Sequence, residues 1–179
     1  MLESEKREIL DALKTGRDAL REALAGVDDP LAARKPGGGG WSILECVEHL
    51  AAAEQSLASR LSSATESHCS QANPTREARI AAVGADRSRP IEAPERARPG
   101  GRFGSLSEAL AAFDGARNKT VQFVEGFNGD PRFWVTHHPL MAEPVNCYEM
   151  LLMISLHPVR HAKQISEIRA ALISPTPQG

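Results

Sequence analysis

The sequence predicts an all-α protein, and three observations support this fold class. Apolar side chains recur at helical spacing in four segments of roughly twenty residues each, which is a typical length for the helices of a bundle. Three of these segments begin with the residue pairs that cap helix N-termini. No segment shows the strict alternation of apolar and polar residues that indicates a strand. We therefore predict one domain, a four-helix bundle, over residues 1–179.

The first helix is predicted over residues 3–25. Its apolar stripe recurs at intervals of four or seven residues and consists of Ile9, Leu13, Leu20 and Leu24. Gly26 marks its end, because glycine is common just past the C-terminus of a helix. Residues 28–40 then contain too much proline and glycine for a helix, so a flexible connection is expected there.

The second helix has the clearest predicted start. Ser42 and Glu45 have the spacing of a capping box, in which each side chain binds the backbone N–H of the other residue. Trp41 and Cys46 flank this start and are placed to form a hydrophobic staple. The helix is expected over residues 43–64, and its apolar stripe consists of Ile43, Val47, Leu50, Leu57 and Leu61.

A link of about forty residues, 65–104, separates the second helix from the third. It is predicted to contain only one or two helical turns, at residues 75–83. Because such a link can run the length of a bundle, the second and third helices are free to point the same way, and we predict up-down-down-up topology. The third helix follows over residues 106–126, where Ser105 and Glu108 repeat the capping-box spacing.

The fourth helix is predicted from Asn146 to about Leu172. Asn146 is a favourable N-cap, and Glu149 stands three residues later, as in the other capping pairs. The helix must end before Pro175. Pro158 lies inside it and removes one backbone hydrogen bond, so we expect a kink one turn before residue 158.

The composition favours an ordinary folded domain. A net charge of −2 gives no field that would attract nucleic acid, so no nucleic-acid partner is expected. Cys46, Cys69 and Cys147 form no CxxC pair and cannot all pair within one chain, which fits a reducing cytoplasm. Residues 1–14 lack the apolar region of a signal peptide, and no stretch is long enough to span a bilayer. We therefore expect neither export nor membrane insertion.

Three histidines form a candidate metal site. His157 and His161 stand four residues apart in the fourth helix, so they share one face, with Cβ atoms roughly 6 Å apart. Imidazole suits zinc, nickel, copper and iron, and a helical pair needs one or two further ligands from a neighbouring helix. His49, at the edge of the apolar stripe of the second helix, is the best candidate. The sequence contains no HExxH motif, which disfavours a zincin protease.

A structural interpretation of the same residues stays open. A lone histidine at an apolar edge, such as His49, is more often a hydrogen-bonded core residue than a ligand. A bundle that has lost its metal, with its histidines hydrogen-bonded in the core, is a further alternative, because Pro158 alters the backbone beside the ligand pair. Three histidines that converge from two helices are harder to explain by packing, since each buried ring needs a partner.

Two segments carry a resemblance to a known family. The stretch WSILECVEHLAAAE resembles the second-helix signature of the DinB/YfiT-like metalloprotein superfamily, and LHPVRHAKQISEIR resembles its fourth-helix signature. The loop HPLMAEPVNCYEML and the Arg-Pro-Gly-Gly sequence before the third helix are also similar. The resemblance implies a four-helix bundle, often dimeric, whose metal ligands fall on His49, His157 and His161. It also implies a divalent metal ion as cofactor, usually nickel or zinc.

The same resemblance suggests a function. Characterised branches of the superfamily include transferases and isomerases that use low-molecular-weight thiols such as bacillithiol or mycothiol, which implies a metal-dependent thiol S-transferase with a small-molecule substrate. Metal-dependent hydrolysis is the second expectation, because a bound divalent ion lowers the pKa of water. A helical bundle that binds metal for stability, sensing or a stress response without catalysis is the third. No motif identifies a catalytic residue.

Four residues near the predicted ligands receive secondary roles. Glu45, one turn before His49, is a candidate acceptor that orients the imidazole, although its capping role competes with this. Cys46 is more readily a buried core residue than a thiolate ligand. His138, in the loop before the fourth helix, is expected either to border the pocket or to be a plain loop residue. Arg160 is placed to face an anionic substrate group or to be solvated.

Overall fold

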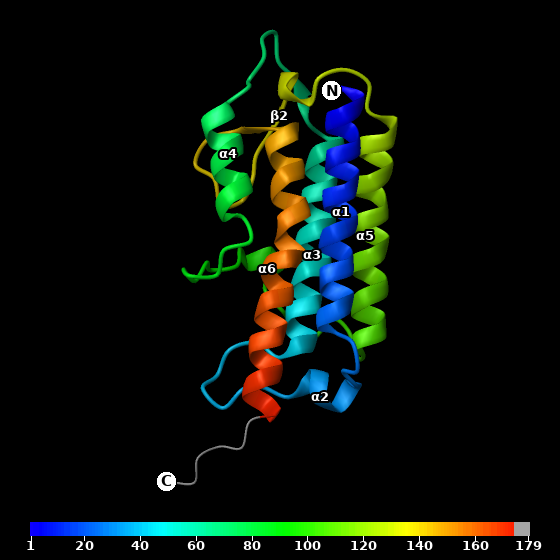
Figure 1. Cartoon of the computed structure of the whole chain (residues 1–179), viewed down its shortest axis with the longest axis vertical. Coiled ribbons are helices and arrows are strands. Elements are labelled where there is room, and N and C mark those ends of the chain that lie inside the picture. Colours follow the sequence, from blue (N-terminus) through cyan, green and yellow to red (C-terminus); the bar gives the residue numbers. More distant parts are fainter. Residues whose placement is uncertain (174–179) are drawn as a thin grey trace.

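The computed structural model describes residues 1–173 and is mostly helical, which confirms the predicted class. Four long helices lie side by side along the long axis of the molecule, namely α1 (Glu3–Ala23), α3 (Ile43–Ser62), α5 (Leu106–Gly126) and α6 (Cys147–Ile173) (Figure 1). The chain descends α1, ascends α3 and α5, and descends α6 in the view of Figure 1. The second and third long helices therefore point the same way. The most extensive packing joins α1 to α6 and α3 to α5.

The two predicted loops contain more structure than the sequence indicated. The predicted flexible connection at 28–40 contains a short helix, α2 (Asp29–Ala33), because Asp28 accepts a hydrogen bond from the backbone of Leu31. The helical turns expected at 75–83 are confirmed as α4 (Pro74–Val83). The link also contains a 3-10 turn, η1 (Glu95–Ala97), and a second 3-10 turn, η2 (Pro131–Phe133), follows α5.

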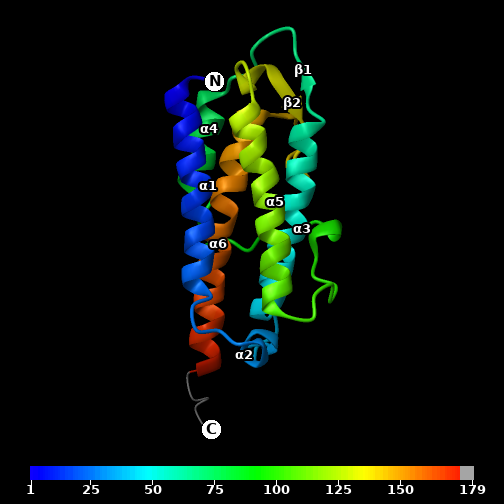
Figure 2. The same ribbon diagram turned by 90° about the vertical axis from the view of Figure 1, so that its right-hand side faces the viewer.

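A small sheet corrects the prediction that no strand is present. It is antiparallel in the order β1-β2-β3 and consists of β1 (Thr65–Glu66), β2 (Trp134–Thr136) and β3 (Val145–Asn146). The sheet lies at the end of the molecule where α3 and α5 finish and α6 begins (Figure 2). Its strands are two or three residues long, which is too short for an alternating pattern to be visible in the sequence.

The predicted helix caps are present, with one difference. Ser42 and Glu45 form the complete capping box, with both reciprocal hydrogen bonds. Ser105 Oγ likewise accepts from the backbone of Glu108. The Glu108 carboxylate, however, accepts from the backbone of Gly104 at 2.8 Å and not from Ser105, so the second box is only half formed. The helix starts predicted from these pairs are correct.

The start of α6 also anchors the link. Asn146 and Glu149 exchange side-chain to backbone hydrogen bonds, as the capping pair predicted. Glu149 is fully buried and accepts a bidentate pair of hydrogen bonds from Arg76 of α4, at 2.6 and 2.7 Å. This charge-assisted pair attaches α4 to the side of α6.

A polar layer divides the core into two apolar halves. One half lies toward α2 and its buried members include Leu20, Val47, Phe113 and Ile165. The other half lies toward the sheet and includes Leu13, Leu57, Val124 and Met150. Between them, the buried carboxylate of Glu54 accepts from Arg117 and Thr120, and both members of the Glu54–Arg117 ion pair are 1% exposed. The three histidines lie in the same middle part of α3 and α6.

Pro158 of α6 lies in this polar layer and does not break the helix. α6 is continuous from Cys147 to Ile173. Proline cannot donate to the carbonyl of Ile154, one turn earlier, but Arg117 donates to that oxygen at 3.2 Å and replaces the missing bond. Gly16 of α1 packs against the same turn, since a Cβ on Gly16 would stand 2.5 Å from the carbonyl oxygen of Ser155. Two neighbouring helices thus support this turn, and the kink expected there stays a prediction.

Candidate metal centre

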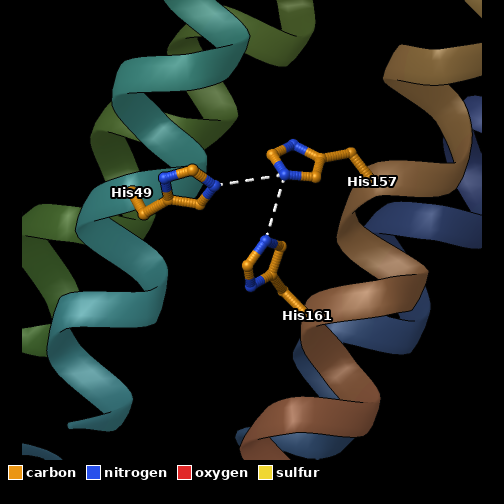
Figure 3. A group of neighbouring side chains, drawn as sticks. All are labelled: His49, His157 and His161. Carbon is orange, nitrogen blue, oxygen red and sulfur yellow. Dashed lines mark hydrogen bonds between the residues drawn. The ribbon is translucent and has the colours of Figure 1, made fainter. Parts of the chain in front are cut away.

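The structure brings the three predicted histidines together (Figure 3). His49 extends from α3, and His157 and His161 extend from successive turns of α6. The Nε2 atom of His157 lies 3.2 Å from that of His49 and 3.0 Å from that of His161. All three possible ligand atoms lie within 4.8 Å of one another. The rings of His49 and His161 are buried, at 4% and 6% exposure, whereas His157 is half-buried.

A backbone carbonyl determines the orientation of the His49 ring. Its Nδ1 atom lies 2.8 Å from the carbonyl oxygen of Ala97, in η1. Because a carbonyl oxygen only accepts hydrogen bonds, Nδ1 must carry the proton. The Nε2 atom of a neutral His49 ring then has a free lone pair, which points at His157 (Figure 3). This is the arrangement that metal-bound histidines use, with one nitrogen on a backbone carbonyl and the other on the ion.

The chemistry of the three rings fits a divalent cation. His157 Nε2 faces two other Nε2 atoms, but one ring nitrogen has either one hydrogen or one lone pair in the ring plane. It can therefore form only one of the two hydrogen bonds, and His49 has no proton to offer. A cation among the three nitrogens would accept all three lone pairs. Two tetrahedral ligands of zinc stand roughly 3.4 Å apart, which is close to the separations of His157 from His49 and from His161.

Burial also keeps the three imidazoles neutral. Removal from water is the main reason why the pKa of each ring is lowered, and for His157 and His161 it is lowered well below the usual value. The rings add to this effect, because a charge on His49 or His161 would repel a charge on His157. Only neutral imidazole binds metal, so the site needs no deprotonation at neutral pH.

The comparison with protein families agrees with this geometry. The family model described as the DinB superfamily matches residues 12–165, a range that includes all three histidines. The chain belongs to the DinB superfamily. This confirms the resemblance that the two helix segments indicated. Family membership and the histidine cluster are both compatible with metal binding. A search of curated proteins found no match to this DinB superfamily chain.

Two residues beside His49 have other tasks. The Glu45 carboxylate accepts from the backbone of Ser42 and pairs with Lys35 at 2.9 Å, and it makes no hydrogen bond to His49. The expected orienting role is instead filled by the Ala97 carbonyl, because the capping box uses Glu45. Cys46 is fully buried, and burial raises the pKa of its thiol to about 12. It is therefore a protonated core residue at neutral pH and not a thiolate.

The other two secondary residues, His138 and Arg160, have different surroundings. His138 is half-buried, and its charge would act on His157, which places it near the site. Burial and the nearby guanidinium of Arg60 lower the pKa of His138 to about 4. Arg160 is buried and donates to the carbonyl of Arg89 at 2.8 Å. Its guanidinium thus holds the link against α6 instead of lying in solvent.

Trp41 is a wall of the site that the sequence did not reveal. Its ring centroid lies 4.8 Å from that of His49 and 6.2 Å from that of His161, and it is nearly parallel to the His161 ring. The sequence assigned Trp41 only to the start of the second helix. Its position about two turns before His49 was the available signal, but which neighbouring helix it contacts depends on the tertiary structure. Within residues 1–173, no helix of this DinB superfamily chain is long and apolar enough to cross a membrane.

Proposed function

We propose that this protein is a metal-dependent enzyme that transfers a low-molecular-weight thiol to an electrophilic substrate. His49, His157 and His161 would hold a divalent ion, nickel or zinc, inside a four-helix bundle of up-down-down-up topology. The observation that carries this proposal is the convergence of three Nε2 atoms from two helices. When bound, the ion would favour the deprotonated form of a thiol substrate, and thiolate is the nucleophilic form.

The number of ligands supports a catalytic site over a purely structural one. Structural zinc sites are closed by four protein ligands, whereas catalytic sites use three and leave a position for substrate. Among the described residues, the cluster contains three histidines and no fourth histidine, cysteine, aspartate or glutamate.

The acidic residues of the two ligand helices favour thiol transfer over hydrolysis. Hydrolysis of a substrate by water usually needs a general base, most often a carboxylate or histidine, within reach of that water. Every carboxylate on α3 and α6 already has a partner. Those partners are Lys35 for Glu45, Arg102 for Glu48, Arg117 for Glu54, Arg76 for Glu149 and Arg87 for Glu167. His138 lies near the cluster, but its pKa of about 4 makes it a weak base. A thiol transfer needs no such base once the thiol is deprotonated, so we keep hydrolysis as the second candidate.

The protein side chains contribute orientation and the exclusion of water. The Ala97 carbonyl holds His49 with its Nε2 lone pair directed into the cluster. Trp41 covers the rings of His49 and His161 and keeps their surroundings apolar. In the reaction, a bond would form between the thiol sulfur and an electrophilic carbon of the second substrate while the bond from that carbon to its leaving group breaks. The leaving group would depart with the electron pair of that bond, and the thiol proton would be released to solvent.

The first prediction concerns metal content. Untagged wild-type protein should contain about one nickel or zinc ion per chain, as one three-ligand site requires. His161→Ala should lose it, because two imidazoles hold a divalent ion much more weakly than three. His68→Ala is the matched control, since His68 is exposed and outside the cluster. Mass spectrometry of the purified proteins measures the metal content. Wild-type protein without metal, even after incubation with zinc and nickel, would contradict the proposal.

A second measurement separates the candidate functions. Cobalt(II) can replace zinc and has visible absorption that changes when a thiolate becomes a ligand. Addition of cysteine to the cobalt-substituted protein should change the spectrum if a thiol has access to the ion. An unchanged spectrum together with full metal content would support a closed, non-catalytic site or a hydrolase.

A further inference from the structure

Glu48, the residue before His49, is a buried carboxylate outside the histidine cluster. It is 1% exposed and accepts four hydrogen bonds, all from residues 100–102 of the link. Three come from backbone N–H groups, those of Gly100 at 2.7 Å, Gly101 at 3.1 Å and Arg102 at 3.2 Å. The fourth comes from the Arg102 side chain at 2.9 Å. Successive backbone N–H groups directed at one anion form a nest, which is an anion-binding backbone conformation.

The local sequence is suited to this nest. Gly101 has φ +73°, in the left-handed region that side chains other than glycine rarely adopt. A Cβ on Gly100 would stand 4.0 Å from Glu48 Oε1, an ordinary contact, so Gly101 is the position where the nest requires glycine. The Arg-Pro-Gly-Gly sequence before α5 thus has a specific partner in α3. The Arg102 side chain is 42% exposed, so the backbone donors provide most of the buried contact.

The same segment carries the carbonyl that holds His49. Ala97 lies three residues before Gly100, is buried, and accepts from His49 Nδ1 at 2.8 Å. Adjacent residues of α3, Glu48 and His49, therefore hold both ends of the short segment 97–102. The segment is short enough that loss of one attachment should displace the other.

The link is also attached to the other ligand helix. Arg160 donates to the carbonyl of Arg89, and Arg87 binds Gln164 and Glu167 of α6. Figure 2 shows the link passing from the α6 side of the molecule to the far side of α3, where η1 lies. The link is thus held by residues next to ligands on both helices, and Glu48 holds the end that contacts a ligand directly.

We propose that Glu48 is a positioning residue for the histidine cluster. Its carboxylate fixes residues 97–102 so that the Ala97 carbonyl holds the proton of His49 on Nδ1 and leaves Nε2 free for the ion. Only the predicted effect of Glu48 on metal affinity rests on the proposed function. Its predicted effect on which nitrogen of His49 carries the proton is a property of the metal-free protein. Partners that orient a ligating histidine in this way typically change metal affinity by about 10-fold to 100-fold when removed.

The test compares Glu48→Gln with Glu149→Gln. Both substitutions neutralise a buried carboxylate that binds a segment of the link, but Glu149 holds α4 through Arg76 and has no contact with residues 97–102. The glutamine amide turns donor atoms toward the nest, so Glu48→Gln should release the segment. Nitrogen-15 NMR of the histidine rings in metal-free protein measures which nitrogen carries the proton. Wild type and Glu149→Gln should show His49 protonated on Nδ1, and Glu48→Gln should show a mixture of both forms.

Zinc affinity is the second measurement, by competition with a chromophoric chelator. Glu48→Gln should bind zinc about 10-fold more weakly than wild type, and Glu149→Gln should match wild type within about 2-fold. Gly101→Ala disrupts the nest from the opposite side while keeping Glu48, and it serves if Glu48→Gln does not fold. A folded variant of either residue that keeps both the Nδ1 proton and wild-type zinc affinity would overturn the inference. If wild type binds no zinc, the proposed function fails, and the NMR measurement alone decides the role of Glu48.

Discussion

Single residues in the candidate metal centre derive their chemistry from burial. His49 and His161 are almost completely removed from water, and this lowers the pKa of both rings. The same effect raises the pKa of the Cys46 thiol, so imidazole is the available ligand and thiolate is not. The low-dielectric surroundings therefore keep the imidazoles neutral, which is the form that binds metal, and keep the neighbouring thiol protonated. The Ala97 carbonyl then selects which nitrogen of His49 is free.

The lowered histidine pKa values predict how the metal-free protein responds to acid. Below the ordinary pKa of 6.5, histidines of the unfolded chain take up protons while the buried rings stay neutral. The free energy of unfolding should therefore fall as the pH decreases below 6.5. Each fully buried histidine contributes at most about 1.4 kcal/mol per pH unit to this loss. Urea unfolding in the presence of a chelator, at about pH 7.5 and about pH 5.5, measures the change.

A histidine variant provides the control for this pH dependence. In His161→Leu the loss of stability between the two pH values should be smaller, because one group that titrates only in the unfolded chain is gone. Buried carboxylates also contribute to acid unfolding, but they are unchanged in the variant. Equal losses in wild type and His161→Leu would show that His161 is not held neutral in the folded protein.

At the scale of elements, the middle of the four long helices depends on close packing of α1 against α6. Gly16 has no side chain where the two helices approach, and this lets Pro158 and the Ser155 carbonyl lie against α1. Proline within α6 is tolerated because its lost hydrogen bond is replaced by Arg117 from α5. The turn that carries His157 is therefore supported by two other helices. The ligand pair converges despite the proline between its members.

Two glycine substitutions test this packing. Gly16→Ala places a Cβ 2.5 Å from a backbone oxygen, so α1 or α6 must move, and we expect a destabilisation of about 1–3 kcal/mol. Gly115→Ala is the matched comparison, because Gly115 is an exposed position inside α5 and its Cβ would meet nothing within 4 Å. It should stabilise the protein by up to about 1 kcal/mol through helix propensity. Urea unfolding measures both, and a stabilising Gly16→Ala would show that the contact is not tight.

At the scale of the whole molecule, the buried guanidinium of Arg117 links the four long helices. Arg117 of α5 pairs with Glu54 of α3 and donates to the carbonyls of Leu13 in α1 and Ile154 in α6, so it contacts all four long helices. A buried charge of this kind is costly unless every donor has a partner. The polar layer around Arg117 and Glu54 lies between the two apolar halves of the core and contacts α6 one turn before His157. Its charge also acts on His157.

Removal of one partner should therefore destabilise the whole fold. Arg117→Met or Glu54→Leu alone should lower the free energy of unfolding by about 3–5 kcal/mol, because each leaves an uncompensated buried charge. The double variant should lose clearly less than the sum of the two, since both charges are then gone. Denaturant unfolding of the four proteins forms a double-mutant cycle. Additive losses would mean that the two side chains act independently.

The local features of this protein were predicted from the sequence. The four long helices, the Ser42 start of α3 and the short helix in the link all follow from apolar periodicity and capping residues, which act over one or two turns. The pairing of His157 with His161 follows from their spacing on one helix. His49 was selected by its place at the edge of an apolar stripe and by the family resemblance, and the structure brings it to the other two.

Other features depended on contacts between residues far apart in the chain. In the small sheet, β1 pairs with β2, which lies about seventy residues later in the chain, and each strand is too short to have a pattern of its own. Glu48 and Ala97 belong to different elements, so neither the nest nor the hydrogen bond to His49 has a local signature. The hydrogen bond from Arg117 to the Ile154 carbonyl, which replaces the bond lost at Pro158, has no local signature either. Short-range periodicity thus determined the helices and the ligand pair of α6, whereas only tertiary packing decided which groups orient, cover and support the site.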